Sequence, residues 1–526
     1  QGNFTGFPTD FVAYGTFDSQ MGQIKSDLSF VPAENGSIQF RGKIETTDFQ
    51  LGKLIATKEL GGISLHGMVK GNYHSKWESL DADFNGAIDQ LQALKYNYTG
   101  ISLNGKISNR KFDGKAVIND PNLKVNFSGL LNLNEKKPMF DFILNLKEAN
   151  LVALKIDTVR KVSQLALGMT ANFSGSSLDN FDGLVQLYDV KYTNPNGNLL
   201  ANNLTINTHL EQNNNSINLN SDFLDASITG AYQFNALFQS ARNVLATYIP
   251  ALRNTPVADL GANQFEFRVT GKNMDELTAL FLPECKIKSP YTLKGKIDSG
   301  QSWFELQGEI PAIEYGTTSL QNLKINIAPD NKKLASLISM EEVAIAKTLN
   351  LRNFELSLQA VDNQIRTRVN WDNKIKSRHK GRIESEIAFE QDTLRKFPLV
   401  HVAILPSEII VADSVWNLSA ASASIDSSDI QINGFAFVNQ NQRLTIDGSI
   451  SKDKTRQMQI GLEGFDLGIL SGYLSNPTSV KGHISGTVNV SDFYDQRIFN
   501  SDLKINGLEF RNQSFGNVSL VNFWDR

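Results

Sequence analysis

Histidines, one cysteine and one basic cluster are the residues of this sequence whose types could do chemistry. His66 and His74 are eight residues apart, so a single strand through both would place two possible metal ligands on one face. Gly67 and Gly71 between them argue against one such strand, and solvated strand histidines are the favoured interpretation. Gly62–His66 begins like the G-x-S-x-G turn of serine hydrolases, but a histidine stands where the second glycine is required.

The remaining catalytic signatures are missing from the sequence. It contains no H-E-x-x-H zinc motif and no G-x-x-x-x-G-K-[ST] phosphate loop. Cys285 is the only cysteine, so neither a disulfide framework nor a thiolate metal site can form, and we expect it to be a buried small residue. We therefore expect no enzyme activity and no cofactor.

One local basic cluster has two interpretations. It could contact phosphate headgroups at the rim of a groove. Alternatively, it is the solvated outer face of strands whose charges protect a sheet edge, which is the commoner situation. The cluster consists of Arg366, Arg368, Lys374, Lys376, Arg378, Lys380 and Arg382.

Charge and hydrophobicity limit the class of protein. The chain has 526 residues, with 51 basic and 55 acidic side chains, a balance that argues against a nucleic-acid partner. Hydrophobic residues make up 41% of the chain, but no run of about 18 apolar residues could span a bilayer. The first residues lack the basic and apolar regions of a signal peptide, and the last ones stop within an alternating pattern. We expect a piece of a longer protein.

A helix-then-strands unit recurs along the chain. In 465–520 a short apolar helical run is broken at Asn476-Pro477 and followed by strictly alternating segments, the period of a strand with one apolar face. Similar units span 48–107, 149–210 and 273–327. A recurring supersecondary unit predicts an array in which each unit packs on its neighbours.

An amphipathic helix is predicted at 234–253, because apolar residues recur there at helical spacing. It either covers one end of a sheet or docks on a membrane or partner. Segment 335–348 is ambiguous between helix and strand. The other segments are short alternating strands with turn residues between them, which predicts antiparallel hairpins.

The repeats suggest four segments without independent globular domains. They are 1–148, which contains the first unit; 149–272, with the second unit and the amphipathic helix; 273–464, with the third unit and a long strand extension; and 465–526, a truncated fourth unit.

The apolar faces of the strands must be covered. A closed core would do this, and so would a long sheet curved into a hydrophobic groove that holds acyl chains; alternation alone leaves both possibilities open. The expected lining residues are Ile217, Leu219, Leu323, Ile325, Ile327, Ile430, Ile432, Leu444, Ile446, Ile450, Ile484, Val488 and Val490.

The unit of short helix, break, strand entering at G-x-x-x-G, and L-x-N-L-x-I-N resembles the AsmA-like superfamily, in particular its TamB branch. The matching stretches are 467–474 with 480–490, and 320–327 (LQNLKINI) beside 200–206. The pattern covers essentially the whole chain as weak repeats, and its Asn-rich turns are similar to versions from Bacteroidota. The resemblance implies a mostly β, elongated array of antiparallel strands curved into a long hydrophobic groove (a β-taco), with a few short amphipathic helices between units.

The resemblance also implies a function. Such proteins lie in the periplasm of Gram-negative bacteria, are anchored in the inner membrane by an N-terminal helix, and carry phospholipid toward the outer membrane. The TamB branch is linked to an Omp85-type partner in outer-membrane protein assembly. The anchor helix and the family's C-terminal domain are not visible in this sequence.

The alternative from another class is a structural or adhesive β-array that binds polysaccharide or a protein partner. It predicts exposed aromatic platforms, whereas the five tryptophans are widely spread.

Overall fold

The structure is a computed structural model, and its chain is mostly β with a few short helices, as the alternating sequence predicts. It divides into two compact units: unit 1 comprises Gln1–Thr229 and Lys272–Pro283, and unit 2 comprises Gly230–Gly271 and Glu284–Arg526. The smaller segments expected from the repeats stay a prediction. The described residues are 2–7, 10–32, 36–54, 57–74, 76–133, 137–211, 214–252, 263–345, 349–373, 379–391, 398–411, 413–471 and 480–524.

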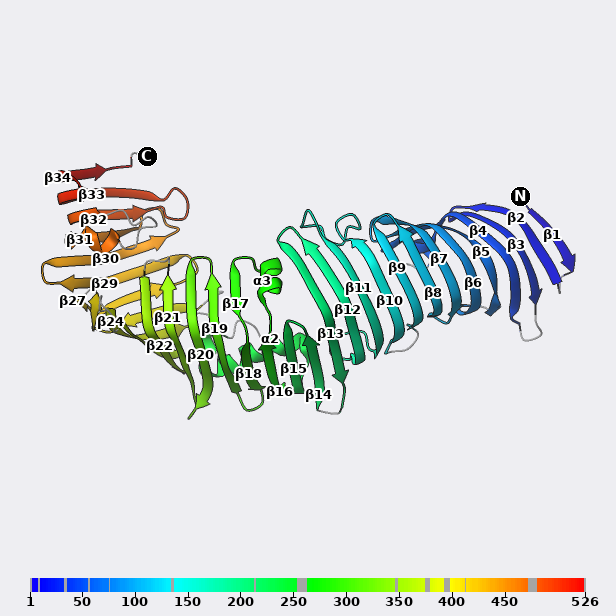
Figure 1. Cartoon of the computed structure of the whole chain (residues 1–526), viewed down its shortest axis with the longest axis horizontal. Coiled ribbons are helices and arrows are strands. Elements are labelled where there is room, and N and C mark those ends of the chain that lie inside the picture. The colour runs from blue at the N-terminus through cyan, green and yellow to red at the C-terminus, as the bar shows by residue number, and fades with distance from the viewer. Residues whose placement is uncertain are drawn as a thin grey trace. The chain divides into compact units, whose positions relative to one another are not determined.

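Unit 1 contains a sheet built from consecutive hairpins (Figure 1). From β1 to β14 each strand pairs antiparallel with the next, and many of the connections are short and contain Asn, Asp or Gly. The strands are β1 (Gly2–Phe7), β2 (Asp10–Ser19), β3 (Gly22–Pro32), β4 (Ile38–Gln50), β5 (Leu60–His74), β6 (Lys76–Ala93), β7 (Tyr96–Ser108), β8 (Lys111–Asp120), β9 (Leu123–Asn132), β10 (Met139–Asn150), β11 (Gln164–Ser174), β12 (Asp182–Asn194), β13 (Gly197–His209), β14 (Asn215–Ser221) and β15 (Leu224–Ala231).

The repeat units that begin at residues 48, 149 and 273 were each expected to start with a short helix, and two of the three do. They are α1 (Leu51–Leu54) and α3 (Asp275–Phe281). The run after Asn150 was predicted wrongly, because residues 151–156 form consecutive turns. The side chain of Asn150 accepts from the backbone N–H of Ala153 there, and that of Asp157 accepts from Val159 and Arg160. Such local side-chain bonds compete with helix formation.

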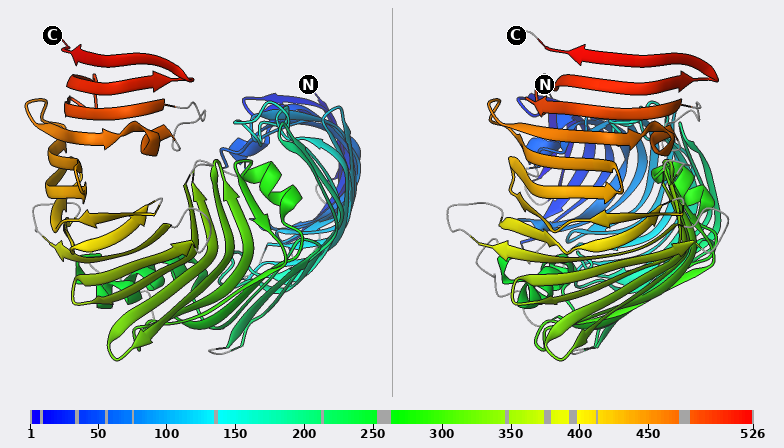
Figure 2. Two further views of the ribbon diagram at one scale, coloured as in Figure 1. Left: turned by 60° about the vertical axis from the view of Figure 1, so that its left-hand side comes forward. Right: turned by 90° about the vertical axis from the view of Figure 1, so that its left-hand side faces the viewer.

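The unit 1 sheet is curved, and its strands bend in the same sense (Figure 2). Helix α3 lies on the concave side, where Leu280 is 1% exposed and covers β13. Leu199 and Ala201 of β13 are buried, while Leu200 between them is exposed. The apolar face of the alternating pattern is therefore the concave one.

Unit 2 is also built from antiparallel strands. From β18 to β25 each pairs with its successor, as do β29 to β34, while β16 pairs with β18 and β17 with β19. The strands are β16 (Gln264–Gly271), β17 (Cys285–Lys288), β18 (Tyr291–Asp298), β19 (Trp303–Tyr315), β20 (Thr318–Asp330), β21 (Lys333–Ile345), β22 (Leu349–Val361), β23 (Gln364–Asn373), β24 (His379–Glu390), β25 (Leu399–Ile404), β26 (Ser407–Val411), β27 (Ser414–Leu418), β28 (Ala421–Ile425), β29 (Asp429–Asn439), β30 (Gln442–Ser451), β31 (Gln457–Asp466), β32 (Val480–Ser491), β33 (Ile498–Phe510) and β34 (Gln513–Asn522).

Two segments of unit 2 show how its strands are divided. The ambiguous segment 335–348 is strand as far as Ile345, because it belongs to β21; residues 346–348 lie outside the described residues. The apolar stretch 399–411 contains two strands. Proline 406 separates β25 from β26, and both pair with β24, at different ends of it.

The predicted amphipathic helix is α2 (Leu237–Tyr248), flanked by the short 3₁₀ turns η1 (Phe234–Ala236) and η2 (Pro250–Leu252). It packs against β18, β19 and β22, with Val244 buried and Phe238 exposed. The Tyr248 hydroxyl donates to the carbonyl of Ser302, so the helix covers part of the unit 2 sheet. The C-terminal helix α4 (Leu467–Ser471) contacts β32. None of the helices in the described part of the chain is long and apolar enough to cross a membrane.

Two asparagines within strands of unit 2 adopt a left-handed backbone conformation. Asn322 in β20 has a φ of 52° and Asn353 in β22 has a φ of 47°, a left-handed conformation that asparagine tolerates better than most residues. Leu320 pairs with Ile313 and Leu323 with Ile310, and Asn322 and Pro311 between these pairs are both unpaired, so the register does not shift. The asparagine of the L-x-N-L-x-I pattern therefore takes a conformation that few other residues adopt at low cost.

Candidate functional site

The apolar face of unit 1 carries a row of phenylalanine rings that crosses neighbouring strands. The ring centroids of Phe112 and Phe127 are 6.1 Å apart, and those of Phe127 and Phe142 are 5.3 Å apart. On the next strand pair, Phe140 stacks on Phe173 at 4.6 Å. Strand register explains the row, because residues on adjacent antiparallel strands point to the same face.

These phenylalanines are only half-buried, although they lie within central strands. In a sandwich, a second sheet would cover such positions. Among the described residues, the largest apolar side chains that are almost fully buried are Trp416, Leu154, Leu280 and Val244. Leu154 lies in a loop, Leu280 in α3 and Val244 in α2. Many apolar residues of the strands are buried as well, so burial varies along the apolar face, and the phenylalanine row is a part of it that is only half-buried.

The lining residues predicted for the C-terminal strands share one face. Ile430 pairs with Ile450, and Ile460 of β31 pairs with both Ile446 and Val488. Pairing across these strands, with register shifts after Ile432 in β29 and after Leu462 in β31, includes the whole predicted set on β29, β30 and β32, namely Ile430, Ile432, Leu444, Ile446, Ile450, Ile484, Val488 and Val490. Ile484 and Val490 are buried and the other six are half-buried.

The remaining predicted lining residues lie on two other strands. On β20, Leu323 is buried, whereas Ile325 and Ile327 are half-buried. Ile217 and Leu219 of β14 are half-buried and pair with residues of β13. They lie in unit 1, and the β20 residues lie in unit 2.

One part of the apolar face in unit 2 is closed. Trp416, Phe465, Ile484 and Ile505 form a buried cluster, with Leu467 and Ile469 of α4 packed against it. The Trp416 ring stacks on Phe437 at 4.6 Å. The sequence predicted Ile484 as a lining residue but gave no signal for the Trp416 cluster, which brings together strands far apart in the chain.

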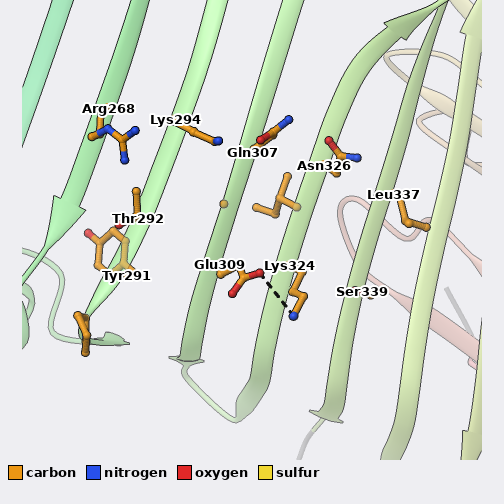
Figure 3. A pocket seen from close by; sticks show the side chains of 13 residues that line it. Arg268, Tyr291, Thr292, Lys294, Gln307, Glu309, Lys324, Asn326, Leu337 and Ser339 are labelled. Carbon is orange, nitrogen blue, oxygen red and sulfur yellow. Dashed lines mark ion pairs between the residues drawn. The ribbon is translucent and has the colours of Figure 1, made fainter.

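The polar face has open hollows of its own. One of about 840 Å³ lies over β16 and β18 to β21, where Lys294, Gln307 and Asn326 follow one another on adjacent strands (Figure 3). Lys324 and Glu309 lie 3.5 Å apart in an ion pair below them. Another, of about 880 Å³, lies over β4 to β8 in unit 1. These hollows are lined mostly by the exposed polar positions of the alternating pattern.

The described part of the basic cluster is paired with carboxylates. Nε of Arg366 lies 3.1 Å from Glu386, and Nε of Arg368 lies 2.8 Å from Glu384. Arg382 also binds Glu384, and hydrogen bonds from Arg382 and Arg368 lower the pKa of this carboxyl. Lys380 lies 3.7 Å from a carboxylate oxygen of Asp372. Lys374, Lys376 and Arg378 lie outside the described residues. This pairing is typical of a solvated strand face, and headgroup contact stays a prediction.

The histidine and cysteine candidates are dispersed. β5 runs through both His66 and His74, contrary to the break favoured by the sequence. Both are exposed, and Nδ1 of His66 lies 2.8 Å from Asp89. No group of three His, Cys, Asp or Glu side chains within the described ranges is placed to hold a metal ion. Cys285 is half-buried in β17 rather than buried.

Asp120 is a buried carboxylate that the sequence did not single out. It is 1% exposed at the β8–β9 turn. It accepts hydrogen bonds from the Tyr96 hydroxyl at 2.7 Å, the Asn122 N–H at 2.8 Å and both donors of Thr99 at 3.0 Å. Burial acts to raise the pKa of Asp120, but these hydrogen bonds together hold it below its ordinary value. Because its partners are turn and strand groups, Asp120 is structural.

The tryptophans form no common aromatic platform in the described part of the chain. Trp416 is buried, Trp371 is half-buried against Gly381, and Trp303 and Trp524 are exposed on different strands or ends. The side chain of Trp77 lies outside the described residues.

Comparison with known proteins gave no family: no family model, curated protein or solved structure matches the chain.

Proposed function

We propose that this protein binds the acyl chains of phospholipids along its apolar face and carries them between membranes. One observation supports the proposal above the others: large apolar side chains such as Phe127 and Phe142 lie within central strands and yet are only half-buried. Exposing apolar surface costs about 25 cal/mol per Å². A face of this kind is stabilised when something apolar covers it, and an acyl chain does so without needing a specific polar partner.

The absence of one deep site fits transport rather than storage. The row Phe112, Phe127 and Phe142 runs across the strands at spacings of 5.3 to 6.1 Å, without a charged side chain among its members. An acyl chain that moves along such a wall exchanges one apolar contact for a similar one. Barriers between positions are therefore low, while the phosphate headgroup stays in water.

The cellular setting rests on the resemblance to the TamB branch. We propose that the protein works in the periplasm of a Gram-negative bacterium, held at the inner membrane by a segment outside this sequence. It would reach toward the outer membrane and bridge phospholipid between the two. An Omp85-type outer-membrane protein is the proposed partner, which adds a role in assembling outer-membrane proteins. No catalytic step is part of the proposal.

The first experiment is lipid analysis of the purified chain by mass spectrometry, with photo-crosslinking. A benzophenone amino acid at Phe127 should crosslink to phospholipid acyl chains, whereas the same group at Ser128 should not. Ser128 is exposed on the opposite face of β9, so it is a matched control. A chain that purifies without lipid and crosslinks equally at both positions would contradict the proposal.

The second experiment places a charge on the face. Ile325 is half-buried and Asn326, its neighbour, is exposed on the other face of β20. We expect Ile325→Glu to lower bound phospholipid while thermal unfolding changes little, and Asn326→Glu to change neither. If Ile325→Glu instead unfolds the unit, its side chain belongs to a closed core and acyl chains do not bind there.

A further inference from the structure

One loop of unit 1 exposes apolar side chains to water. It spans residues 151–163 and connects β10 to β11. Val159 is 90% exposed and Ile156 is 58% exposed, and Val162 is exposed as well. Leu154, in contrast, is buried and attaches the loop to the sheet. The loop therefore holds its apolar tip away from the protein.

This tip has a defined conformation. The Asp157 carboxylate accepts from the N–H groups of Val159 at 3.1 Å and Arg160 at 3.0 Å, and the Arg160 guanidinium lies 3.1 Å from it. The bond from the Arg160 N–H is the main reason why the pKa of Asp157 falls to about 2. At the base of the loop, Ser163 lies 3.2 Å from the Tyr192 hydroxyl. An ordered loop presents Val159 without the entropic cost of ordering it on binding.

A second apolar group lies beside the same loop. The Tyr192 ring stacks on Phe281 of α3 at 5.8 Å, and the side chains of Asn194 and Asn196 both donate to the carbonyl of Leu280. These bonds fix the end of α3, where Phe281 and Leu282 are exposed. Tyr192 thus contacts both the base of the loop and the end of α3, so the loop and the exposed end of α3 lie side by side.

This surface lies on one long edge of the sheet. Because consecutive strands of unit 1 are antiparallel, the connections β4–β5, β6–β7, β8–β9, β10–β11 and β12–β13 all lie on the same side, which we call the loop edge. Leu94, in the β6–β7 turn, is 55% exposed beside the exposed Lys95. At about 4.8 Å per strand, this turn is about 19 Å from the 151–163 loop.

The charges beside the apolar tip are mostly positive. Between residues 155 and 162 there are three basic side chains, Lys155, Arg160 and Lys161, and one acidic side chain, Asp157. Arg160 is paired with Asp157, while Lys155 and Lys161 are exposed and have no ion-pair partner among the described residues. The acidic residues of α3 are in its first turn, at the helix end away from Phe281.

We propose that the loop edge of unit 1 docks on an anionic lipid bilayer, with Ile156 and Val159 entering the interface and Lys155 and Lys161 binding lipid phosphates. Apolar side chains between lysines match such a surface, since membrane binding combines buried apolar area with attraction to anionic headgroups. A polar protein surface would leave Val159 without an apolar contact. This docking does not depend on acyl chains in the concave face.

The test is co-sedimentation of the full chain with vesicles. We expect binding to vesicles of equimolar phosphatidylglycerol and phosphatidylcholine, and weak binding to pure phosphatidylcholine. The double variants Lys155→Glu/Lys161→Glu and Ile156→Asp/Val159→Asp should each bind the anionic vesicles at least about tenfold more weakly. Matched controls are Arg110→Glu and Leu178→Asp, exposed residues in the β7–β8 and β11–β12 connections of the opposite edge, which should bind normally.

A second readout reports insertion directly. With Cys285→Ser to remove the native thiol, an environment-sensitive dye on Val159→Cys should shift its emission to the blue when anionic vesicles are added. The proposal is overturned if the chain binds no vesicle, if the opposite-edge variants weaken binding as much as the loop variants, or if the dye does not shift. Since the Ile325→Glu variant should still bind vesicles, failure of docking and failure of acyl-chain binding are distinguishable.

Discussion

The rings of Phe127 and Phe142 lie 5.3 Å apart on neighbouring strands, and both are only half-buried. A pair of phenylalanines at this distance ordinarily belongs to a sealed core. Here it lies on the concave face of a curved sheet, where its outer surface is available to a ligand.

Truncation of Phe127 should therefore cost less stability than truncation of a core phenylalanine. We expect Phe127→Ala to lower the free energy of unfolding by about 1–2 kcal/mol, below the 3–5 kcal/mol typical of fully buried aromatic residues. Urea unfolding of lipid-free protein measures this. Leu280→Ala is the comparison, because Leu280 is a buried residue of α3. We expect this substitution to lower the free energy of unfolding by about 2–5 kcal/mol. A larger loss at Phe127 than at Leu280 would indicate a closed core.

The left-handed backbone conformation of Asn322 predicts an unusual order of substitutions. A β-branched residue is strained at a φ of 52°, so Asn322→Val should destabilise unit 2 by about 1–2 kcal/mol. Asn322→Gly should change the stability little, because glycine adopts this conformation freely. Thermal unfolding of the two variants checks the order. Equal changes of stability in the two variants would mean that the left-handed conformation is not the reason why asparagine occupies this position.

Asp120 makes part of the stability depend on pH. Its folded-state pKa lies below the ordinary value of 3.8, so the carboxylate stabilises the fold above pH 3.8 and this contribution is lost as the pH falls through the folded-state pKa. We expect Asp120→Asn to cost about 1–3 kcal/mol at neutral pH, since hydrogen bonds from Tyr96 and Thr99 lose their charged acceptor. Unfolding of both proteins at a series of acidic pH values should show that the difference between their free energies of unfolding shrinks below pH 3.8. If this difference stayed constant with pH, Asp120 would not be a source of the pH dependence of stability.

Two substitutions of Trp416 distinguish the contribution of packing from that of hydrogen bonding. Its Nε1 is buried without a hydrogen-bond partner within the described residues. Replacement by phenylalanine removes no hydrogen bond, so Trp416→Phe should cost much less than Trp416→Ala, for which we expect about 3–5 kcal/mol. Chemical denaturation gives both values. A large loss for Trp416→Phe would reveal a partner for the indole N–H.

Alternation in the sequence was sufficient to predict antiparallel strands and the shared face of Ile430, Ile450 and Val488. These features depend on the two-residue period and on local turns. The helix expected after Asn150 failed, because the side chains of Asn150 and Asp157 bind nearby backbone groups, which apolar spacing does not report. The left-handed conformation of Asn322 was not predicted, although this asparagine was noticed in the repeated pattern.

The candidate sites were harder to predict than the strands. Whether an apolar face is open or closed depends on what packs over it, and the cluster around Trp416 is closed by α4 and by strands distant in sequence. Cross-strand pairing of Arg366 and Arg368 with glutamates likewise requires the register of β23 and β24. The 151–163 loop had no signal of its own, because exposed Val159 is indistinguishable in sequence from a valine inside a helix.

The hairpin connectivity of unit 1 imposes a parity rule on its evolution. Each turn lies on one long edge or the other according to whether its number along the chain is odd or even. Insertion of a hairpin, two strands at a time, lengthens the array by about 9.6 Å and leaves every later turn on its original edge. Insertion of one strand would move the 151–163 loop and every later connection to the opposite edge. Related chains should therefore differ in length by whole hairpins.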